Sequence, residues 1–271
     1  MLVFIQVVLA LILTVLYSIQ INLVFDLLGI ISVILIFIVF NLIIAIILLL
    51  LFAIFIYTTE KMSIKAMWKH LVVHIYNMYI FRFYYRVRLI VTGKENLPKN
   101  NNFVIYSNHI EYTDPLFIMQ VYKDFPIAFI AKKPLFRFPI LKNLMYSLGN
   151  IPITKYADRS ALESIIKAIK QVKDGQPMGI FPEGKRTYKN EMIDFKPGSF
   201  KLAQKAKADI SPVCLYDMHK LSKKWRILPT KVYMHILPLI PYEEYKDLDT
   251  ASLSEKIYNI INEQLTKFKN N

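Results

Sequence analysis

A histidine and an aspartate lie five positions apart in a turn that follows a short β-like run. His109 comes just after the run at 103–106, and Asp114 is followed by Pro115, a residue typical of a helix's first turn. The turn between them can fold the Asp114 carboxylate back towards the imidazole. A carboxylate that accepts from one ring nitrogen leaves the other nitrogen to take a proton from a substrate hydroxyl. The pair is therefore a candidate general base with its orienting partner.

No obvious serine elbow accompanies this pair, and Cys214 is the single cysteine. We therefore expect the nucleophile to be an alcohol on the substrate rather than a protein side chain. The structural alternative makes His109 a strand-end histidine and Asp114 a helix cap. On spacing alone that alternative ranks first, because a histidine and an aspartate at this separation often occur together by chance.

A second loop places charged residues where α/β folds bind their ligands. A predicted strand at 179–181 leads into a Pro-Glu-Gly turn that contains Glu183 and Gly184, and two cations, Lys185 and Arg186, follow. A carboxylate, exposed backbone amides and two cations then share one loop at the C-terminal end of a strand. A solvated charged turn is the structural alternative. The combination of this loop with the histidine turn favours an active site.

These segments resemble the glycerolipid acyltransferases, and most closely the lysophosphatidic acid acyltransferases among them. The resemblance covers roughly residues 88–240. Four blocks carry it in the family's order and spacing: Asn108-His109 with Asp114, the sequence GNIPI at 149–153, FPEG at 181–184 with Arg186, and ISPV at 210–213.

The resemblance implies transfer of a fatty acyl group from acyl-CoA or acyl carrier protein to the free hydroxyl of lysophosphatidic acid. The product is phosphatidic acid, an intermediate of phospholipid biosynthesis. The resemblance also implies that His109 is the general base, that Asp114 orients it, and that the loop at Glu183 and Gly184 holds the glycerol phosphate. The further substrate-binding candidates are Asn108, Lys155, Arg159, Arg186 and Pro212. A thioester donor needs neither ATP nor a metal, so no cofactor and no metal site are expected.

Two positions depart from the family's blocks. The second block carries Lys155 where arginine is usual, and the third carries Lys185 where threonine is usual. An ammonium group is a point charge without the bidentate fork of a guanidinium, so phosphate recognition is expected to be altered or shared with Arg159. Glycerol 3-phosphate and other lysophospholipids therefore stay open as alternative acceptors.

The elements that must position these residues follow from the alternation of β-rich and helical stretches beyond residue 87. This order predicts a layered α/β acyltransferase domain over 88–271, a sheet with flanking helices. The expected strands lie at 88–92, 103–106, 179–181, 210–216 and 231–237. Two capping boxes, Ser160 with Glu163 and Ser252 with Glu255, predict a helix over 160–173 and a closing helix after 252.

The first 60 residues contain no lysine or arginine, which predicts a transmembrane anchor over 1–60. Residues 30–57 are apolar except for Ser32 and Asn41, and as a helix they would measure about 42 Å against a hydrocarbon core of about 30 Å. Residues 2–25 are apolar but interrupted, so a second span is favoured over a segment that lies on the surface. A signal peptide is not expected, because no basic leading region precedes the apolar stretch.

All 34 lysines and arginines and 18 of the 20 carboxylates lie beyond residue 60, which gives that part a formal charge of +16. This excess beside the membrane predicts an integral membrane protein whose catalytic domain lies on the cytoplasmic face. Cations and aromatic residues alternate over 61–87, as in an amphipathic helix at the membrane interface, although a helix packed on the domain is an equal alternative.

The positive charge attracts anionic partners. Anionic membrane lipid is favoured over nucleic acid, because each cation near such a surface contributes about 1 kcal/mol. No nucleic acid partner is expected. The rival of another class is a non-catalytic adaptor that docks on anionic lipid. A third hypothesis is a membrane-bound thioesterase in which water replaces the lipid alcohol at His109.

Overall fold

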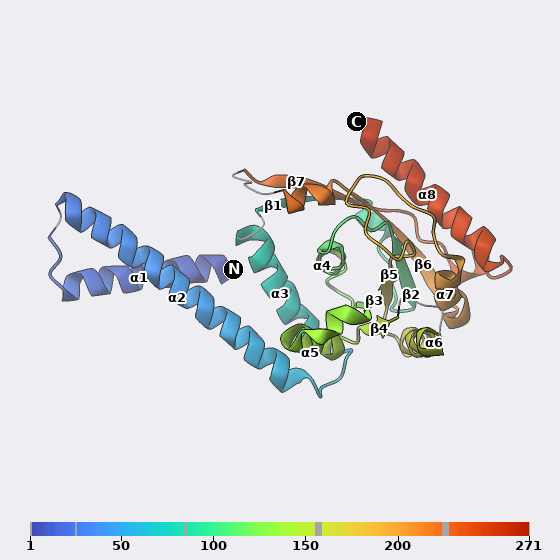
Figure 1. The fold of residues 1–271 in the computed structure, drawn as a ribbon, viewed down its shortest axis with the longest axis horizontal. Coiled ribbons are helices and arrows are strands. Elements are labelled where there is room, and N and C mark those ends of the chain that lie inside the picture. Colours follow the sequence, from blue (N-terminus) through green and yellow to red (C-terminus); the bar gives the residue numbers. More distant parts are fainter. Residues whose placement is uncertain (1, 25, 84–85, 155–158, 224–227, 271) are drawn as a thin grey trace. The chain divides into compact units, whose positions relative to one another are not determined.

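The structure is a computed structural model of the 271-residue chain that describes residues 2–24, 26–83, 86–154, 159–223 and 228–270 (Figure 1). The chain divides into two compact units, Met1–Thr59 and Glu60–Asn271.

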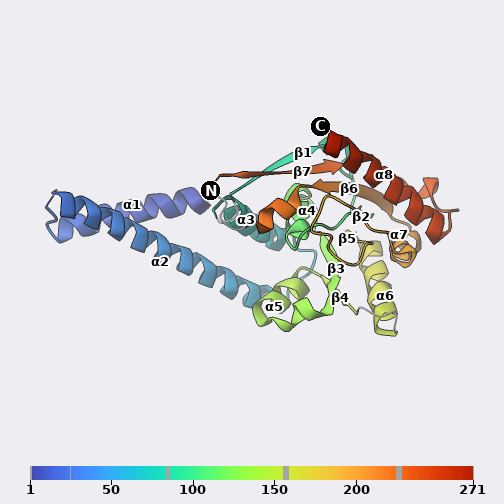
Figure 2. The same ribbon diagram turned by 45° about the horizontal axis from the view of Figure 1, so that its top comes forward.

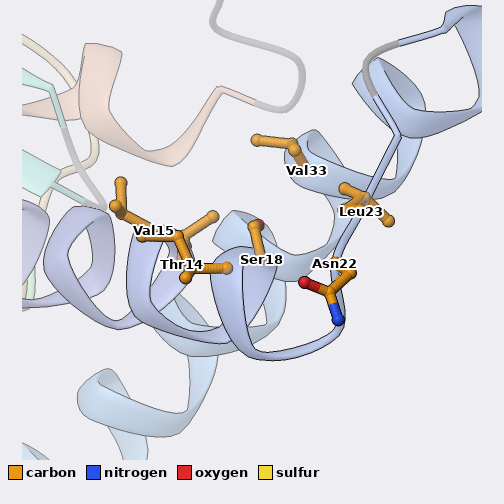
Figure 3. Close-up of a pocket in the computed structure, with 7 residues that line it drawn as sticks. Thr14, Val15, Ser18, Asn22, Leu23 and Val33 are labelled. Carbon is orange, nitrogen blue, oxygen red and sulfur yellow. The ribbon is translucent and has the colours of Figure 1, made fainter.

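The first unit consists of two helices, α1 (Leu2–Gln20) and α2 (Leu27–Thr59), that pack against each other. Both are long and apolar enough to cross a membrane, as expected for 2–25 and 30–57, and they indicate membrane association. A cavity of about 420 Å³ lies between the two helices near their turn (Figure 3).

One side of α1 faces α2 through residues four positions apart. Its buried residues are Gln6, Ala10, Thr14 and Ser18, which are polar or small. The Gln6 Nε2 donates to the Asn41 carbonyl of α2 at 3.0 Å. Small residues allow close approach of two helices and polar ones bond across them, while the remaining apolar surface is left exposed.

The second unit is built on a seven-stranded sheet in the order β1-β7-β6-β2-β5-β3-β4 (Figures 1 and 2). Only the β6–β7 pair is antiparallel among the described neighbours, and the other pairs run parallel. The strands are β1 (Val87–Thr92), β2 (Phe103–Ser107), β3 (Ala128–Lys132), β4 (Ile151–Ile153), β5 (Met178–Ile180), β6 (Asp209–Tyr216) and β7 (Thr230–Ile236). The predicted layered α/β fold is thus confirmed.

Helices cover both faces of this sheet, and β2 is its central strand. Successive side chains of a strand point to opposite faces, so Val104 and Tyr106 enter one core while Phe103 and Ile105 enter the other. The first core includes residues of α6 (Arg159–Lys173), α7 (Lys201–Ala206) and α8 (Thr250–Asn270). The second includes residues of α3 (Met67–Phe83) and α4 (Asp114–Val121). A shorter helix, α5 (Pro139–Ser147), precedes β4.

Two predicted helix starts are wrong in register. The Ser252–Glu255 box does not open α8, because the Asp249 carboxylate accepts from the amides of Ala251 and Ser252, each at 2.8 Å. Asp249, three positions before Ser252, therefore caps the helix.

The Ser160–Glu163 box does not open α6 either. Helix α6 already includes Arg159, so Ser160 lies inside the helix rather than at its cap. The Glu163 carboxylate pairs instead with Arg159 at 3.1 Å, an exposed contact one helical turn apart.

One side of α3 packs on the domain. Its Phe81 ring stacks on Phe117 of α4 with centroids 4.0 Å apart, and Lys69 is fully buried. Trp68 and Leu71 are exposed on the same helix. Packing on the domain therefore accounts for one side of 61–87, and contact of the exposed side with a membrane interface stays a prediction.

Candidate active site

His109 and Asp114 meet at the C-terminal end of β2. The His109 Nδ1 lies 2.8 Å from the Asp114 Oδ2. The same oxygen accepts from the backbone amides of Ile110 at 2.7 Å and Glu111 at 2.8 Å. Helix α4 begins at Asp114 with Pro115 in its first turn, as predicted. The Asp114 carboxylate therefore stabilises the turn and also orients the imidazole.

This geometry leaves one nitrogen of the ring for a substrate. A carboxylate only accepts hydrogen bonds, so the bonded Nδ1 carries a proton and Nε2 is the free base. The His109 side chain is 16% exposed, while that of Asp114 is fully buried. Burial raises the pKa of Asp114, and the donors from His109, Glu111 and Ile110 oppose that rise. The Phe181 ring stacks on the imidazole with centroids 4.0 Å apart.

The Glu183 loop lies against this turn because β5 is the parallel neighbour of β2. The Glu183 Oε1 accepts from the backbone amide of His109 at 2.9 Å. In return, the amides of Thr187 and Tyr188 donate to the carbonyls of His109 and Ile110 at 3.0 and 3.1 Å. The structure thus brings together the two segments that the sequence singled out.

Glu183 is an unusual carboxyl group. Burial raises its pKa to about 8, and the amides of His109 and Ile193 oppose the rise. Its Oε2 is buried and has no partner among the described residues. The next residue, Gly184, has a φ of +69°, and a Cβ there would lie 2.9 Å from the Lys196 ammonium. The turn therefore requires glycine.

Arg186 brings a cation to the same site. Its guanidinium lies over the Tyr112 ring, 3.3 Å from the centroid, which fixes the side chain beside the histidine turn. Its buried Nε has no partner among the described residues. A guanidinium held in this way can bind a phosphate.

Asn108 follows β2 directly, and Pro212 lies within β6. The Asn108 side chain donates to the Leu215 carbonyl at 2.9 Å and accepts from the Leu215 amide at 2.8 Å. Both polar atoms of the side chain therefore join two strands, which gives Asn108 a positioning role, and its contact with substrate stays a prediction. Pro212 is buried within β6 beside Tyr106, and its carbonyl accepts from the Leu237 amide at 3.0 Å. That position holds two strands together.

The remaining two candidates are cationic. Lys155 lies outside the described residues. Arg159 opens α6 with a side chain that is 92% exposed, and its described partner is Glu163 on the same helix. The described contacts therefore do not join Arg159 to the histidine turn.

Sequence reasoning missed Glu111, a buried carboxylate two residues after His109. Its Oε1 accepts from the Tyr112 amide at 2.8 Å, and its Oε2 accepts from the Ser222 hydroxyl. Ser222 closes a short 3-10 helix, Met218–Ser222, that follows β6. A charged residue inside the motif was the available signal, but its distant partner could not be read from local pattern.

The comparisons with known proteins agree with this geometry. A family model described as acyltransferase matches residues 88–216. A 1-acyl-sn-glycerol-3-phosphate acyltransferase of Borreliella burgdorferi is 35% identical over 183 residues, which cover 67% of this chain and 71% of that protein. One of Bacillus subtilis is 27% identical over 178 residues, 64% of this chain and 87% of that protein.

A solved structure shares the fold. The crystal structure of the 1-acyl-sn-glycerophosphate acyltransferase PlsC from Thermotoga maritima matches with a TM-score of 0.63 at 23% identity, over 74% of this chain and 79% of that one. Sequence, fold and the paired His109 and Asp114 agree. The chain therefore belongs to the 1-acyl-sn-glycerol-3-phosphate acyltransferase family of enzymes.

Proposed function

We propose that this enzyme transfers a fatty acyl group from acyl-CoA or acyl carrier protein to the free hydroxyl of lysophosphatidic acid, giving phosphatidic acid. The observation that carries the proposal is the 2.8 Å contact between His109 Nδ1 and Asp114 Oδ2 at the end of β2. The acceptor is supported by relatives that are named 1-acyl-sn-glycerol-3-phosphate acyltransferases.

In the proposed mechanism, His109 Nε2 takes the proton of the acceptor hydroxyl while that oxygen attacks the thioester carbonyl. Asp114 stabilises the imidazolium that forms. The new carbon–oxygen bond gives a tetrahedral intermediate, which collapses as the carbon–sulfur bond breaks. The thiolate then receives the proton from His109, so the products are an ester and a free thiol and the base is regenerated.

A direct transfer without an acyl-enzyme fits the remaining nucleophiles. Cys214 is buried in the middle of β6, and burial raises the pKa of its thiol well above the ordinary value. A protonated, buried thiol is a poor nucleophile. The acceptor alcohol is therefore the group that His109 activates.

The acceptor's phosphate is proposed to bind at the Glu183 loop. Arg186 supplies a fixed guanidinium, and the exposed Lys185 adds a second cation. Lys155 and Arg159 remain proposed phosphate ligands from the neighbouring block. Glu183 is proposed to position His109, because its Oε1 already accepts from the His109 amide.

The two apolar helices are proposed to make the enzyme an integral membrane protein whose second unit lies on the cytoplasmic face. All lysines and arginines follow residue 60, which supports this orientation. Residues 61–87 are proposed to lie at the interface, where anionic lipid contacts their cations. Both acyl chains would then reach the site from the bilayer.

The test is acyl transfer from labelled palmitoyl-CoA by the detergent-solubilised enzyme, with lysophosphatidic acid, glycerol 3-phosphate and lysophosphatidylcholine as parallel acceptors. We expect phosphatidic acid from the first acceptor, and a rate that falls about 10²–10⁴-fold in His109→Ala. His74→Ala is the matched control, because His74 lies on α3 and contacts Gln120 rather than the site.

Each rival predicts a different result. Release of free palmitate that does not respond to any acceptor would identify a thioesterase. If another acceptor is acylated faster than lysophosphatidic acid, the proposed acceptor is wrong but the acyl-transfer reaction stands. Binding to anionic liposomes without turnover by the parent chain would replace the enzyme by an adaptor.

A further inference from the structure

A cavity of about 240 Å³ lies at the turn that follows His109, and the proposed acceptor site does not use it. It is lined by Glu111, Tyr112, Thr113, Leu221 and Ser222, and we call it the Glu111 pocket. Its first three residues belong to the turn between His109 and Asp114. The other two belong to the 3-10 helix after β6, the neighbour of β2 opposite β5.

The pocket is close to the base. Consecutive Cα atoms are 3.80 Å apart, so the Cα atoms of His109 and Glu111 are at most about 7.6 Å apart. The strands β2 and β6 run parallel, so both walls stand at the C-terminal edge of the sheet. This is the edge at which α/β folds bind their ligands.

The wall of the pocket carries both acceptors and donors of hydrogen bonds. The Glu111 side chain is buried, and its carboxylate accepts from the Ser222 hydroxyl. Thr113 is only 8% exposed, and its hydroxyl has no partner among the described residues. It does not cap α4 either. A buried hydroxyl without a partner is rare and costly, which points to a ligand that completes it.

The lining also limits the chemistry of the ligand. A phosphate is excluded by the Glu111 carboxylate, because none of the described lining residues is a cation. An acyl chain is excluded by the carboxylate and two hydroxyls, which an alkyl group would leave unpaired. The ligand is therefore uncharged and carries both N–H donors and carbonyl acceptors, as amides do.

The cations lie outside this pocket, on two sides of it. Tyr112 forms one wall and carries the Arg186 guanidinium against its ring, on the side of the proposed acceptor phosphate. At the opposite wall, the helix of Leu221 and Ser222 also contains Lys220, and the exposed Lys223 follows it. If a ligand fills the pocket with a neutral segment and carries a phosphate at the end of that segment, the phosphate would lie near Lys223.

We propose that the Glu111 pocket binds the pantetheine arm of the acyl donor. The two amides of this arm match the Glu111 carboxylate and the Thr113 hydroxyl, the thioester points to His109, and the terminal phosphate points to Lys223. Acyl-CoA and acyl carrier protein both present this arm, so the pocket serves either donor. The proposal rests on the acyl transfer proposed above and adds the side from which the donor enters.

Steady-state kinetics of the full chain tests it, with palmitoyl-CoA and palmitoyl-pantetheine as donors. Thr113→Val keeps the shape of the side chain and removes one hydrogen bond, so the KM for both donors should rise about three- to tenfold. Ser222→Leu fills the pocket and should raise both donor KM values by about tenfold or more. The KM for lysophosphatidic acid should stay within about twofold of the parent in both variants, since a uniform loss would indicate general damage.

Thr266→Val, on the exposed side of α8, is the matched control and should leave every constant unchanged. If Ser222→Leu fails to fold, the donor KM of Thr113→Val is the result that tests the proposal. Two results with an active parent would overturn the proposed donor site while the acyl transfer stands. In one, the variants keep the donor KM of the parent; in the other, they raise the KM for lysophosphatidic acid instead. A parent that forms no phosphatidic acid overturns the acyl transfer and the pocket's ligand together.

Discussion

Two buried carboxylates hold His109 from different sides, and they differ in the donors that they receive. Asp114 Oδ2 accepts from the imidazole and from two backbone amides. Glu183 accepts from the amides of His109 and Ile193, and one oxygen of each carboxylate, Asp114 Oδ1 and Glu183 Oε2, has no partner among the described residues. A carboxylate with three donors is compensated for its burial better than one with fewer. We therefore expect Asp114 to be the carboxylate that stabilises the imidazolium, and Glu183, whose pKa burial raises to about 8, to position the His109 backbone.

Asp114→Asn should separate the catalytic role of this residue from its structural role. The amide oxygen can still accept from Ile110 and Glu111, but it can no longer stabilise an imidazolium at His109. We expect kcat to fall about 10²–10⁴-fold with little change in either KM. The midpoint of thermal unfolding, measured in parallel, should stay near that of the parent. An unchanged kcat would leave Asp114 as a helix cap only.

Glu183 should make the stability of the enzyme depend on pH. In the folded state its pKa is about 8, against an ordinary value of 4.5. Between these values the unfolded chain releases the proton first, so stability falls as the pH rises. The parent should lose roughly 3–5 kcal/mol relative to Glu183→Gln from pH 4.5 to pH 8.

The measurement for Glu183 is denaturant unfolding of parent and variant in the same detergent at each pH. Glu183→Gln should be the more stable protein, relative to the parent, at the alkaline end. A difference between the two that does not change with pH would mean that the glutamate ionises normally in the folded state.

At the scale of elements, the position of the site depends on hydrogen bonds between the ends of neighbouring strands. Asn108 spans from the end of β2 to Leu215 of β6 with one donor and one acceptor. Asn108→Ala would leave the Leu215 amide and carbonyl buried without that partner, at a cost of about 1–3 kcal/mol for each group. We expect the free energy of unfolding to fall by about 2–5 kcal/mol.

Asn259→Ala, at an exposed position of α8, is the control and should change the free energy of unfolding by less than about 0.5 kcal/mol. Chemical unfolding followed by circular dichroism measures both variants. If Asn108→Ala has the same free energy of unfolding as the parent, the Asn108 side chain does not stabilise the contact between β2 and β6. A direct contact with substrate would then be its expected role.

The central strands and the histidine turn could be predicted because local pattern encodes them. Five strands follow from β-rich runs, and Pro115 marks the start of α4. The strands β3 and β4 were missed: β4 has three residues and contains Pro152, and β3 runs directly into Lys133-Pro134. A strand of three residues, or one whose end merges with a Lys-Pro turn, carries too little periodicity to be read from sequence.

The site residues divide in the same way. His109, Asp114, Glu183 and Arg186 lie in two local blocks, and the structure brings them together as expected. The role of Asn108 could not be predicted, because its partner lies 107 positions away on β6. The contact of Glu111 with Ser222 spans 111 positions and leaves no local trace. Long-range contacts of this kind decide which polar groups remain free for a substrate.

At the scale of the whole molecule, the chain separates an apolar unit from a basic one. Residues 61–271 carry a formal charge of +16, and the second unit has hydrophobic cores on both faces of its own sheet. The site residues described above all belong to the second unit. The expected contribution of the first unit is to keep the enzyme where lysophosphatidic acid is concentrated, which raises the encounter rate without lowering the chemical barrier.

Removal of residues 2–59 should therefore affect catalysis only when the acceptor is embedded in a bilayer. Confinement to a surface raises the effective substrate concentration by about 10²-fold or more, so kcat/KM on vesicles that contain lysophosphatidic acid should fall by about that factor. With a short-chain lysophosphatidic acid below its micellar concentration, kcat/KM should equal that of the full chain. Equal losses with both acceptors, in a truncated protein whose circular dichroism shows a folded domain, would mean that the apolar helices act on the chemistry itself.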